Sequence, residues 1–169
     1  MTGFPALVAA LSTAGVRFVL MGVAGANHWA RSGAAIFTTQ DYDLFLPLDV
    51  DTQIAAWKAC RSVGLDLWSA GESLGLPLDR WLAEQVVGRR ALVRASDGRG
   101  LDVDLSLVMA GFDFETVWAE RRVFVVDRVE VPVARLRHIV ESKARAGREK
   151  DRLFLATHAD SLRDLMNEE

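Results

Sequence analysis

Four aspartates occur in two pairs, at places where the sequence also predicts core strands. In FTTQDYDLFLP, Asp41 and Asp43 are two residues apart and lead into an apolar run, and in LDVDLSL, Asp102 and Asp104 alternate with aliphatic residues. Side chains two apart on a strand point to the same face, so each pair places two carboxylates side by side. Like charges this close raise each other's pKa, and a positive ion between them would relieve the repulsion.

The chemistry that these carboxylates predict is the binding of a divalent cation. If the two strands are neighbours, Asp41, Asp43 and Asp104 face one site, with Asp102 as the alternative to Asp104. Mg²⁺, or Mn²⁺ in its place, is held by a few carboxylates, and substrate phosphates and water complete its octahedron. Two such ions about 3.5–4 Å apart can activate an attacking hydroxyl and stabilise a leaving pyrophosphate. The alternative is that the aspartates lie at solvated strand ends.

A glycine turn before the first aspartate pair offers a place for phosphates. VRFVLMG, residues 16–22, predicts a buried strand, and the small residues of VAGANHWARSG, residues 23–33, predict a helix packed close to the sheet. Gly22 and Gly25 let the backbone approach a ligand, and the first turn of a helix has free N–H groups. Turns of this kind are common in proteins, so the glycine turn predicts a phosphate site only in combination with the aspartates that follow it in the sequence.

The segments MGVAG, DYD and DVD, in this order, resemble the nucleotidyltransferase superfold, which is also called the polymerase-beta-like fold. That fold has a strand ending in hG[GS], a helix, a strand that opens with Dx[DE], and a carboxylate on a later strand. The segment VPVARLRHIVESKARAGREKD is similar to the C-terminal helices of bacterial nucleotidyltransferase-like proteins of the AbiEii and related toxin groups. Together these resemblances cover residues 16–47 and 101–160, and the basic motif falls on Lys143, Arg148, Lys150 and Asp151.

The resemblance implies a Mg²⁺-dependent enzyme that binds ATP or another NTP and transfers NMP to a hydroxyl or phosphate acceptor. It implies that the acceptor is a tRNA or a protein and that the setting is a toxin–antitoxin or phage-defence system, with a cognate toxin or antitoxin as partner. The catalytic and metal-binding residues would be Asp41, Asp43 and Asp104. The nucleotide phosphates would be bound by Gly22, Val23, Lys143 and Arg148.

Two alternatives remain open at the level of the sequence. Val23 stands where the family has glycine or serine, and Phe37 stands where many relatives have an arginine, a role that Arg31 could take over. These departures favour a catalytically degenerate, antitoxin-like module that binds a partner. The second alternative is a small-molecule nucleotidyltransferase of the antibiotic-modifying type, whose acidic cleft would come from Glu72, Asp79 and Glu84.

The elements that must position these residues predict a mixed α+β fold, with a nucleotidyltransferase-type mixed sheet flanked by helices and followed by a C-terminal helical pair. Periodicity predicts helices over 5–14, 52–64, 81–87 and 113–121, with Asp51 and Asp113 as N-caps, and an irregular stretch over 65–80. Hairpins are expected over 89–109 and 122–133, and two helices over 134–147 and 148–166. We expect one domain over 1–169, with an α/β core over 1–133 and helices over 134–169.

Composition narrows the class of protein. The chain has 169 residues, half of them hydrophobic, and a net charge of −3, which argues against a global nucleic-acid surface. Cys60 is the only cysteine, which excludes an intrachain disulfide and a cysteine-rich zinc site. The apolar stretch near the N-terminus is short and lacks a basic leader, so we expect no signal peptide, no membrane span and a cytoplasmic location.

Overall fold

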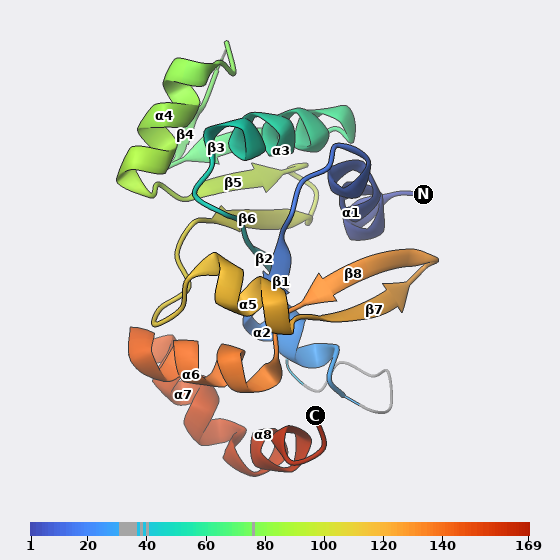
Figure 1. Cartoon of the computed structure of the whole chain (residues 1–169), viewed down its shortest axis with the longest axis vertical. Helices are drawn as coiled ribbons and strands as arrows, with labels where there is room; N and C mark the ends of the chain where they lie inside the picture. The colour runs from blue at the N-terminus through green and yellow to red at the C-terminus, as the bar shows by residue number, and fades with distance from the viewer. Residues whose placement is uncertain (31–36, 38, 40, 76) are drawn as a thin grey trace.

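The chain folds around one eight-stranded mixed sheet with helices on both faces (Figure 1). The computed structural model describes residues 1–30, 37, 39, 41–75 and 77–169. Across the sheet the strand order is β4-β3-β5-β6-β2-β1-β8-β7. The strands are β1 (Val19–Met21), β2 (Asp41–Phe45), β3 (Asp66–Ser69), β4 (Glu72–Ser73), β5 (Val93–Ser96), β6 (Asp102–Ser106), β7 (Arg122–Val126) and β8 (Val129–Val133). This architecture confirms the predicted α+β class.

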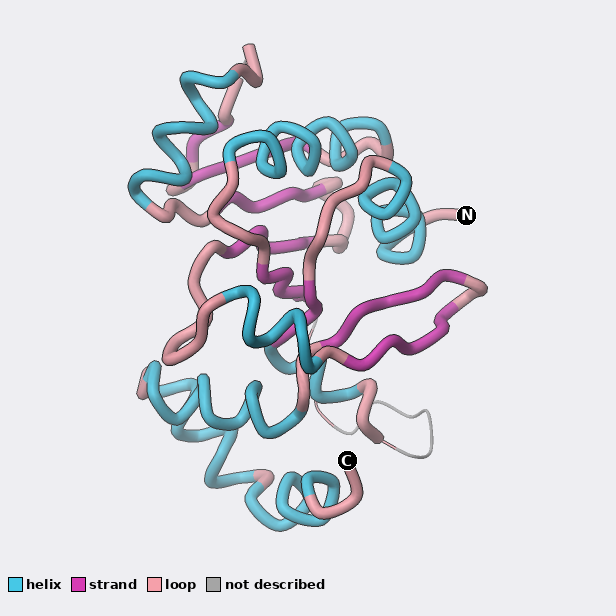
Figure 2. Tube along the Cα trace, viewed as in Figure 1, coloured by secondary structure: helices cyan, strands magenta, loops and turns pink. Residues whose placement is uncertain are grey.

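The sheet divides the hydrophobic core into two parts, one on each face, and helices cover both. Figure 2 shows the strands between these two groups of helices. On one face the main cluster joins α1 and α3 to strand residues such as Leu20, Leu44 and Leu105. On the other face a smaller cluster joins Phe45 and Val19 to α5 and α6. The helices are α1 (Gly3–Thr13), α2 (Gly22–Asn27), α3 (Val50–Ser62), α4 (Arg80–Arg89), α5 (Phe114–Glu120), α6 (Leu136–Ala146), α7 (Glu149–Thr157) and α8 (Ala159–Met166).

The burial pattern of β2 explains why carboxylates can lie beside the core. Leu44 and Phe45 are fully or almost fully buried on opposite faces, whereas Asp41 is exposed and Asp43 is half-buried. Phe45 packs edge-on against Phe114 of α5, with ring centroids 5.5 Å apart. Asp43 and Asp41 follow on the same face as Phe45, toward the start of the strand. The face of β2 that α5 covers therefore changes from apolar at Phe45 to acidic at Asp43, two residues earlier in the strand.

Two of the predicted helix caps were tested by the structure, and one was wrong. Asp113 caps α5, because its carboxylate accepts a hydrogen bond of 2.8 Å from the Thr116 amide. The N-cap of α3 is Asp49 and not Asp51. The extended backbone of Asp49 aims its carboxylate at the Thr52 amide, 2.8 Å away, whereas Asp51 already lies in the first helical turn.

The stretch over 65–80, which we expected to be irregular, contains the hairpin of β3 and β4. Its loop is Ala70-Gly71, and both residues have positive φ, as a two-residue hairpin turn requires. The pattern hid this hairpin because β4 is only two residues long and exposed.

Two other predicted helices differ in length. The helix expected over 23–33 is the six-residue α2, which ends at Asn27, and its last predicted residues lie outside the described part of the chain. The second C-terminal helix is divided into α7 and α8, which meet at His158. Within the described residues, no helix combines the length and apolar character that a membrane span needs.

Candidate functional site

The two aspartate pairs come together in adjacent strands. Strands β2 and β6 pair in parallel, with Asp41 beside Asp102 and Asp43 beside Asp104. Paired residues of neighbouring strands share a face, so all four carboxylates lie on the side of the sheet that α5 and α6 cover. Asp43 and Asp104 line a pocket of about 480 Å³, whereas Asp41 and Asp102 lie outside its lining. Of the two candidates for a third carboxylate, only Asp104 therefore lines this pocket.

Asp43 has the most unusual electrostatic environment of the four. Burial raises its pKa, and the negative charges of Asp104 and Asp41 raise it further, while Lys143 and Lys150 oppose the shift. Among the described residues, no side chain donates a hydrogen bond to this carboxylate. A cation bound at this half-buried acid would offset the repulsion between the carboxylates. The two lysines across the pocket would attract the anions that such a cation binds.

Gly22 lies against the carboxylate of Asp43. It has a φ of +67°, which an L side chain rarely adopts, and an added Cβ would collide with Oδ2 of Asp43. The turn between β1 and α2 therefore needs glycine both for its backbone conformation and for the space it leaves to Asp43. Gly22 lines the pocket, but Val23 packs partly buried against the main core and is not among the lining residues.

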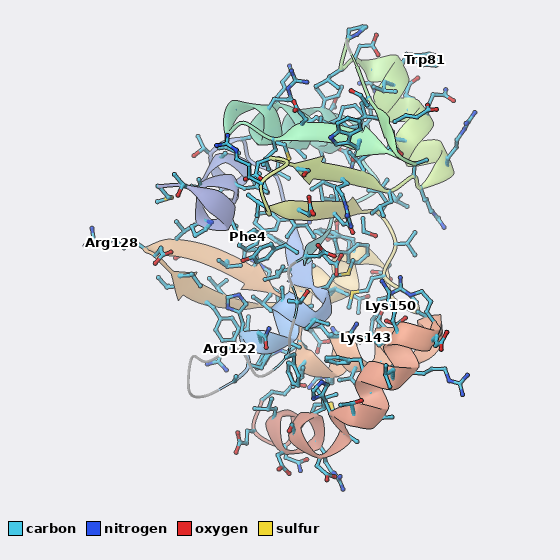
Figure 3. All side chains as sticks on the ribbon, turned by 180° about the vertical axis from the view of Figure 1, so that it is seen from behind. Phe4, Trp81, Arg122, Arg128, Lys143 and Lys150 are labelled. Atoms are coloured by element: carbon cyan, nitrogen blue, oxygen red, sulfur yellow. The ribbon has the colours of Figure 1, made fainter. Side chains whose placement is uncertain are left out.

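The opposite wall of the pocket is cationic and comes from the C-terminal helices. Lys143 of α6, Arg148 at the start of α7 and Lys150 in its first turn all line the pocket. Figure 3 shows Lys143 and Lys150 on these neighbouring helices. The resemblance assigned phosphate binding to Lys143 but not to Lys150, and the charges of both lysines oppose the rise in the pKa of Asp43.

The buried carboxylate of Asp151 holds the side chains of this cationic wall in place. Its side chain is 1% exposed and accepts hydrogen bonds from Arg148 Nε at 2.7 Å and from Lys143 Nζ at 3.4 Å. Burial alone would raise the pKa of Asp151, but the hydrogen bond from Arg148 and the charge of Lys143 outweigh it, and the pKa is lowered. The Lys143 ammonium also lies 4.9 Å from the centre of the Phe154 ring. Asp151 thus holds two phosphate-binding candidates in fixed positions.

Arg94 is the residue of the site that our reading of the sequence missed. It stands opposite Asp104 in the antiparallel pair of β5 and β6. Its guanidinium donates to both carboxylate oxygens, Nε to Oδ1 at 2.8 Å and NH2 to Oδ2 at 3.1 Å. A terminal nitrogen of Arg94 also lies 4.0 Å from the carboxylate of Asp41. The Asp104 side chain, 13% exposed, is held by this planar fork.

Most residues on which the two alternative functions depend have a structural role or lie at the exposed edge of the sheet. Asp79 caps α4 by accepting from the Leu82 amide, and Glu84 pairs with Arg80 at 3.2 Å. Glu72 is exposed on the edge strand β4. Phe37 is buried, and its ring packs edge-on against Phe154, so its side chain belongs to the core. Arg31 lies outside the described residues.

The donor set fits Mg²⁺ bound together with phosphates better than a preformed metal cage. In the described part of the chain, no three acidic, histidine or cysteine side chains converge closely enough to hold a metal ion. Mg²⁺ commonly uses one or two carboxylates and takes its other ligands from water and substrate phosphates. Asp43 supplies one carboxylate inside the pocket, Asp41 lies two residues away on the same face of β2, and the cations of α6 and α7 border the space that phosphates would fill.

Comparison with known proteins supports the fold. No family model matches the sequence, and no curated protein matches it. The structure is similar to the crystal structure of an antigenic nucleotidyltransferase-like protein from Paracoccidioides brasiliensis, with a TM-score of 0.53 at 16% identity. The match covers 95% of this chain and 72% of that chain. At this identity the likeness concerns the fold alone: the chain has a nucleotidyltransferase-like fold, as its motifs predict.

Proposed function

We propose that this chain is a nucleotidyltransferase that binds Mg²⁺–NTP in the pocket between the aspartates and the C-terminal helices. The observation that carries the proposal is one arrangement: Asp43 and Asp104 in register on adjacent strands, facing Lys143, Arg148 and Lys150 across one pocket. A sheet face with like charges faces a cationic wall, so a metal–triphosphate complex complements both surfaces. The fold is one in which such sites occur.

In this proposal Asp41 and Asp43 hold the metal ion, and the backbone at Gly22 borders the phosphates. When bound, Mg²⁺ offsets phosphate charge and supports the departure of pyrophosphate. Lys143 neutralises the triphosphate as a mobile point charge, whereas Arg148 presents a planar fork. The oxygen of the acceptor attacks the α-phosphorus, the bond from the α-phosphorus to its bridging oxygen breaks, and pyrophosphate leaves with that electron pair. When the acceptor is a hydroxyl, Asp104 takes its proton.

The acceptor and the biological setting are proposed from the resemblance of the C-terminal helices to toxin-type relatives. We propose a hydroxyl or phosphate of a tRNA or a protein as acceptor, within a toxin–antitoxin or phage-defence system. The test is to incubate the purified chain with NTPs labelled at the α-phosphate, Mg²⁺ and either acceptor class. Transfer of the α label, absent from an Asp41→Ala/Asp43→Ala variant, is expected. A parallel incubation uses NTPs labelled at the γ-phosphate, and transfer of that label instead would identify a phosphotransferase and contradict the proposal.

One observation favours a second candidate, the degenerate module that binds nucleotide or a partner without catalysis. Arg94 already occupies both oxygens of Asp104, so that carboxylate is less available to a reacting group. Nucleotide binding that depends on Asp43, with no label transferred to any acceptor, would support this candidate over the enzyme.

A further inference from the structure

The two sides of the carboxylate surface are not equivalent. On the α6–α7 side, Asp43 has no hydrogen-bonding side chain among the described residues and faces Lys143 and Lys150. On the β5 side, Asp104 is bound by the fork of Arg94, which also approaches Asp41. A site that takes two divalent cations needs carboxylate oxygens free on both sides. Here only the side of Asp43 offers them.

The position of Arg94 is set by the sheet and does not depend on a flexible loop. Residues 94 and 104 are direct cross-strand partners, and three further residue pairs of β5 and β6 keep this register. On either side of Arg94, Val93 and Ala95 are fully buried in the core, which fixes the strand that carries it. The carboxylate of Asp104 also raises the pKa of Arg94, so its positive charge is permanent.

We propose that Arg94 takes the place of a second divalent cation at Asp104, so that the site binds one metal ion per chain, on the side of Asp43. This inference rests on the proposed function, because it concerns the metal content of the same site. A cation next to Asp104 would have to displace a hydrogen-bonded fork or lie beside a guanidinium, where two positive charges repel each other. The guanidinium supplies positive charge beside Asp104 and holds its carboxylate in place.

The test counts Mn²⁺ ions by electron paramagnetic resonance, with the chain saturated with α,β-methylene ATP or with the analogue of the NTP that binds best. Two Mn²⁺ ions about 3.5–4 Å apart, as in two-metal sites, give an exchange-coupled signal, whereas one ion gives an isolated six-line spectrum. For the natural chain we expect one bound ion and the isolated spectrum. For Arg94→Gln we expect two ions and the coupled spectrum, because Asp104 becomes free.

Three further variants make the result specific. Arg94→Lys keeps the charge and is expected to keep one ion, whereas Arg94→Gln/Asp104→Asn removes the second site and should return the count to one. Arg89→Gln, at an exposed arginine at the end of α4, is the matched control and should leave one ion. Thermal unfolding of each variant shows which ones are folded. If Arg94→Gln does not fold, the natural chain still tests the inference, because a coupled pair of ions there overturns it.

The outcomes separate this inference from the proposed function. A coupled pair of ions in the natural chain, or a single ion in folded Arg94→Gln, overturns the role of Arg94 and leaves the proposed function standing. If the natural chain binds no Mn²⁺ with nucleotide, the proposed function fails, and the inference fails with it.

Discussion

At the scale of single residues, the proposed site depends on the protonation state of the Asp43 carboxylate. Burial and the charges of Asp104 and Asp41 raise its pKa. A raised pKa in the folded chain means that ionised Asp43 disfavours folding, and that this cost appears as the pH rises through the folded-state pKa. Metal binding needs the ionised form, so affinity for Mg²⁺ is expected to fall as the pH drops through the same range.

Asp43→Asn should therefore stabilise the chain at pH 7 in the absence of metal. We expect a gain of about 0.5 kcal/mol, the scale of one unfavourable cross-strand pair, and no gain near pH 3, where the acid is already protonated. Urea unfolding at both pH values measures this difference. Asp66→Asn on β3, which lies opposite Ser96 and not opposite an acid, is the matched control. A clear loss of stability at pH 7 would give Asp43 a structural role and count against the metal site.

Gly22→Ala should both strain the turn and displace Asp43. Non-glycine residues at positive φ cost on the order of 1–3 kcal/mol, and the added Cβ would collide with the Asp43 carboxylate. We expect that loss in urea unfolding, together with weaker Mg²⁺–NTP binding in calorimetry. Gly88→Ala in the last turn of α4, where a Cβ meets nothing within 4 Å, should be neutral or stabilising. Equal losses in the two variants would argue against a special role for Gly22.

The sequence allowed the aspartates to be found but not Arg94. Alternation along DYD and DVD assigns carboxylates to a strand face from the pattern alone. Arg94 becomes visible only when the hairpin register is known, because residues 94 and 104 are placed symmetrically about Arg99 in the turn. The hairpin predicted over 89–109 turns at SDGRG, residues 96–100, and counting outward from the midpoint of this hairpin, residue 99, pairs residue 94 with residue 104.

At the scale of elements, the junction of α6 and α7 fixes the cationic wall. Asp151 is buried and pairs with Lys143 and Arg148, and its lowered pKa means that its ionised form favours folding. This contribution is present above the ordinary pKa of an aspartate and is lost as the pH falls through the lowered folded-state value.

Asp151→Asn should therefore loosen the junction and the phosphate site together. Because Arg148 is largely exposed, we expect a loss of about 1–3 kcal/mol, below that of a fully buried pair, and weaker nucleotide binding. Urea unfolding at pH 7 and calorimetry measure the two effects. Asp160→Asn, which breaks a pair with Arg163 on the surface of α8, should change stability by less than about 1 kcal/mol. A binding loss without any stability loss would place Asp151 in direct contact with the ligand.

Elements with a strong pattern were predicted, and elements that depend on distant partners were not. The hairpin of β7 and β8 followed from its alternation, and α5 followed from its capping aspartate. The hairpin of β3 and β4 was missed because β4 is short and exposed, and it exists by pairing at the edge of the sheet. Likewise, only the packing of α7 on α6 brings Lys150 to the pocket, so its position there could not be predicted from the pattern.

At the scale of the whole molecule, the site exists because β2 and β6 pair in parallel although about 60 residues separate them. No local pattern determines that pairing or the strand order of the sheet. The resemblance to a known superfold suggested that the two strands are neighbours, but it gave neither their direction nor the strand order. The likeness in structure confirms the fold. The chemistry stays a proposal, since a fold can host several functions.

The most direct measurement is calorimetric titration of the chain with each of the four NTPs, with and without Mg²⁺, beside the Asp41→Ala/Asp43→Ala variant. The account predicts that at least one NTP binds only in the presence of Mg²⁺ and that the folded variant does not bind it. Absence of binding by the natural chain, or equal binding by the variant, would contradict the central claim that these carboxylates form a metal–nucleotide site.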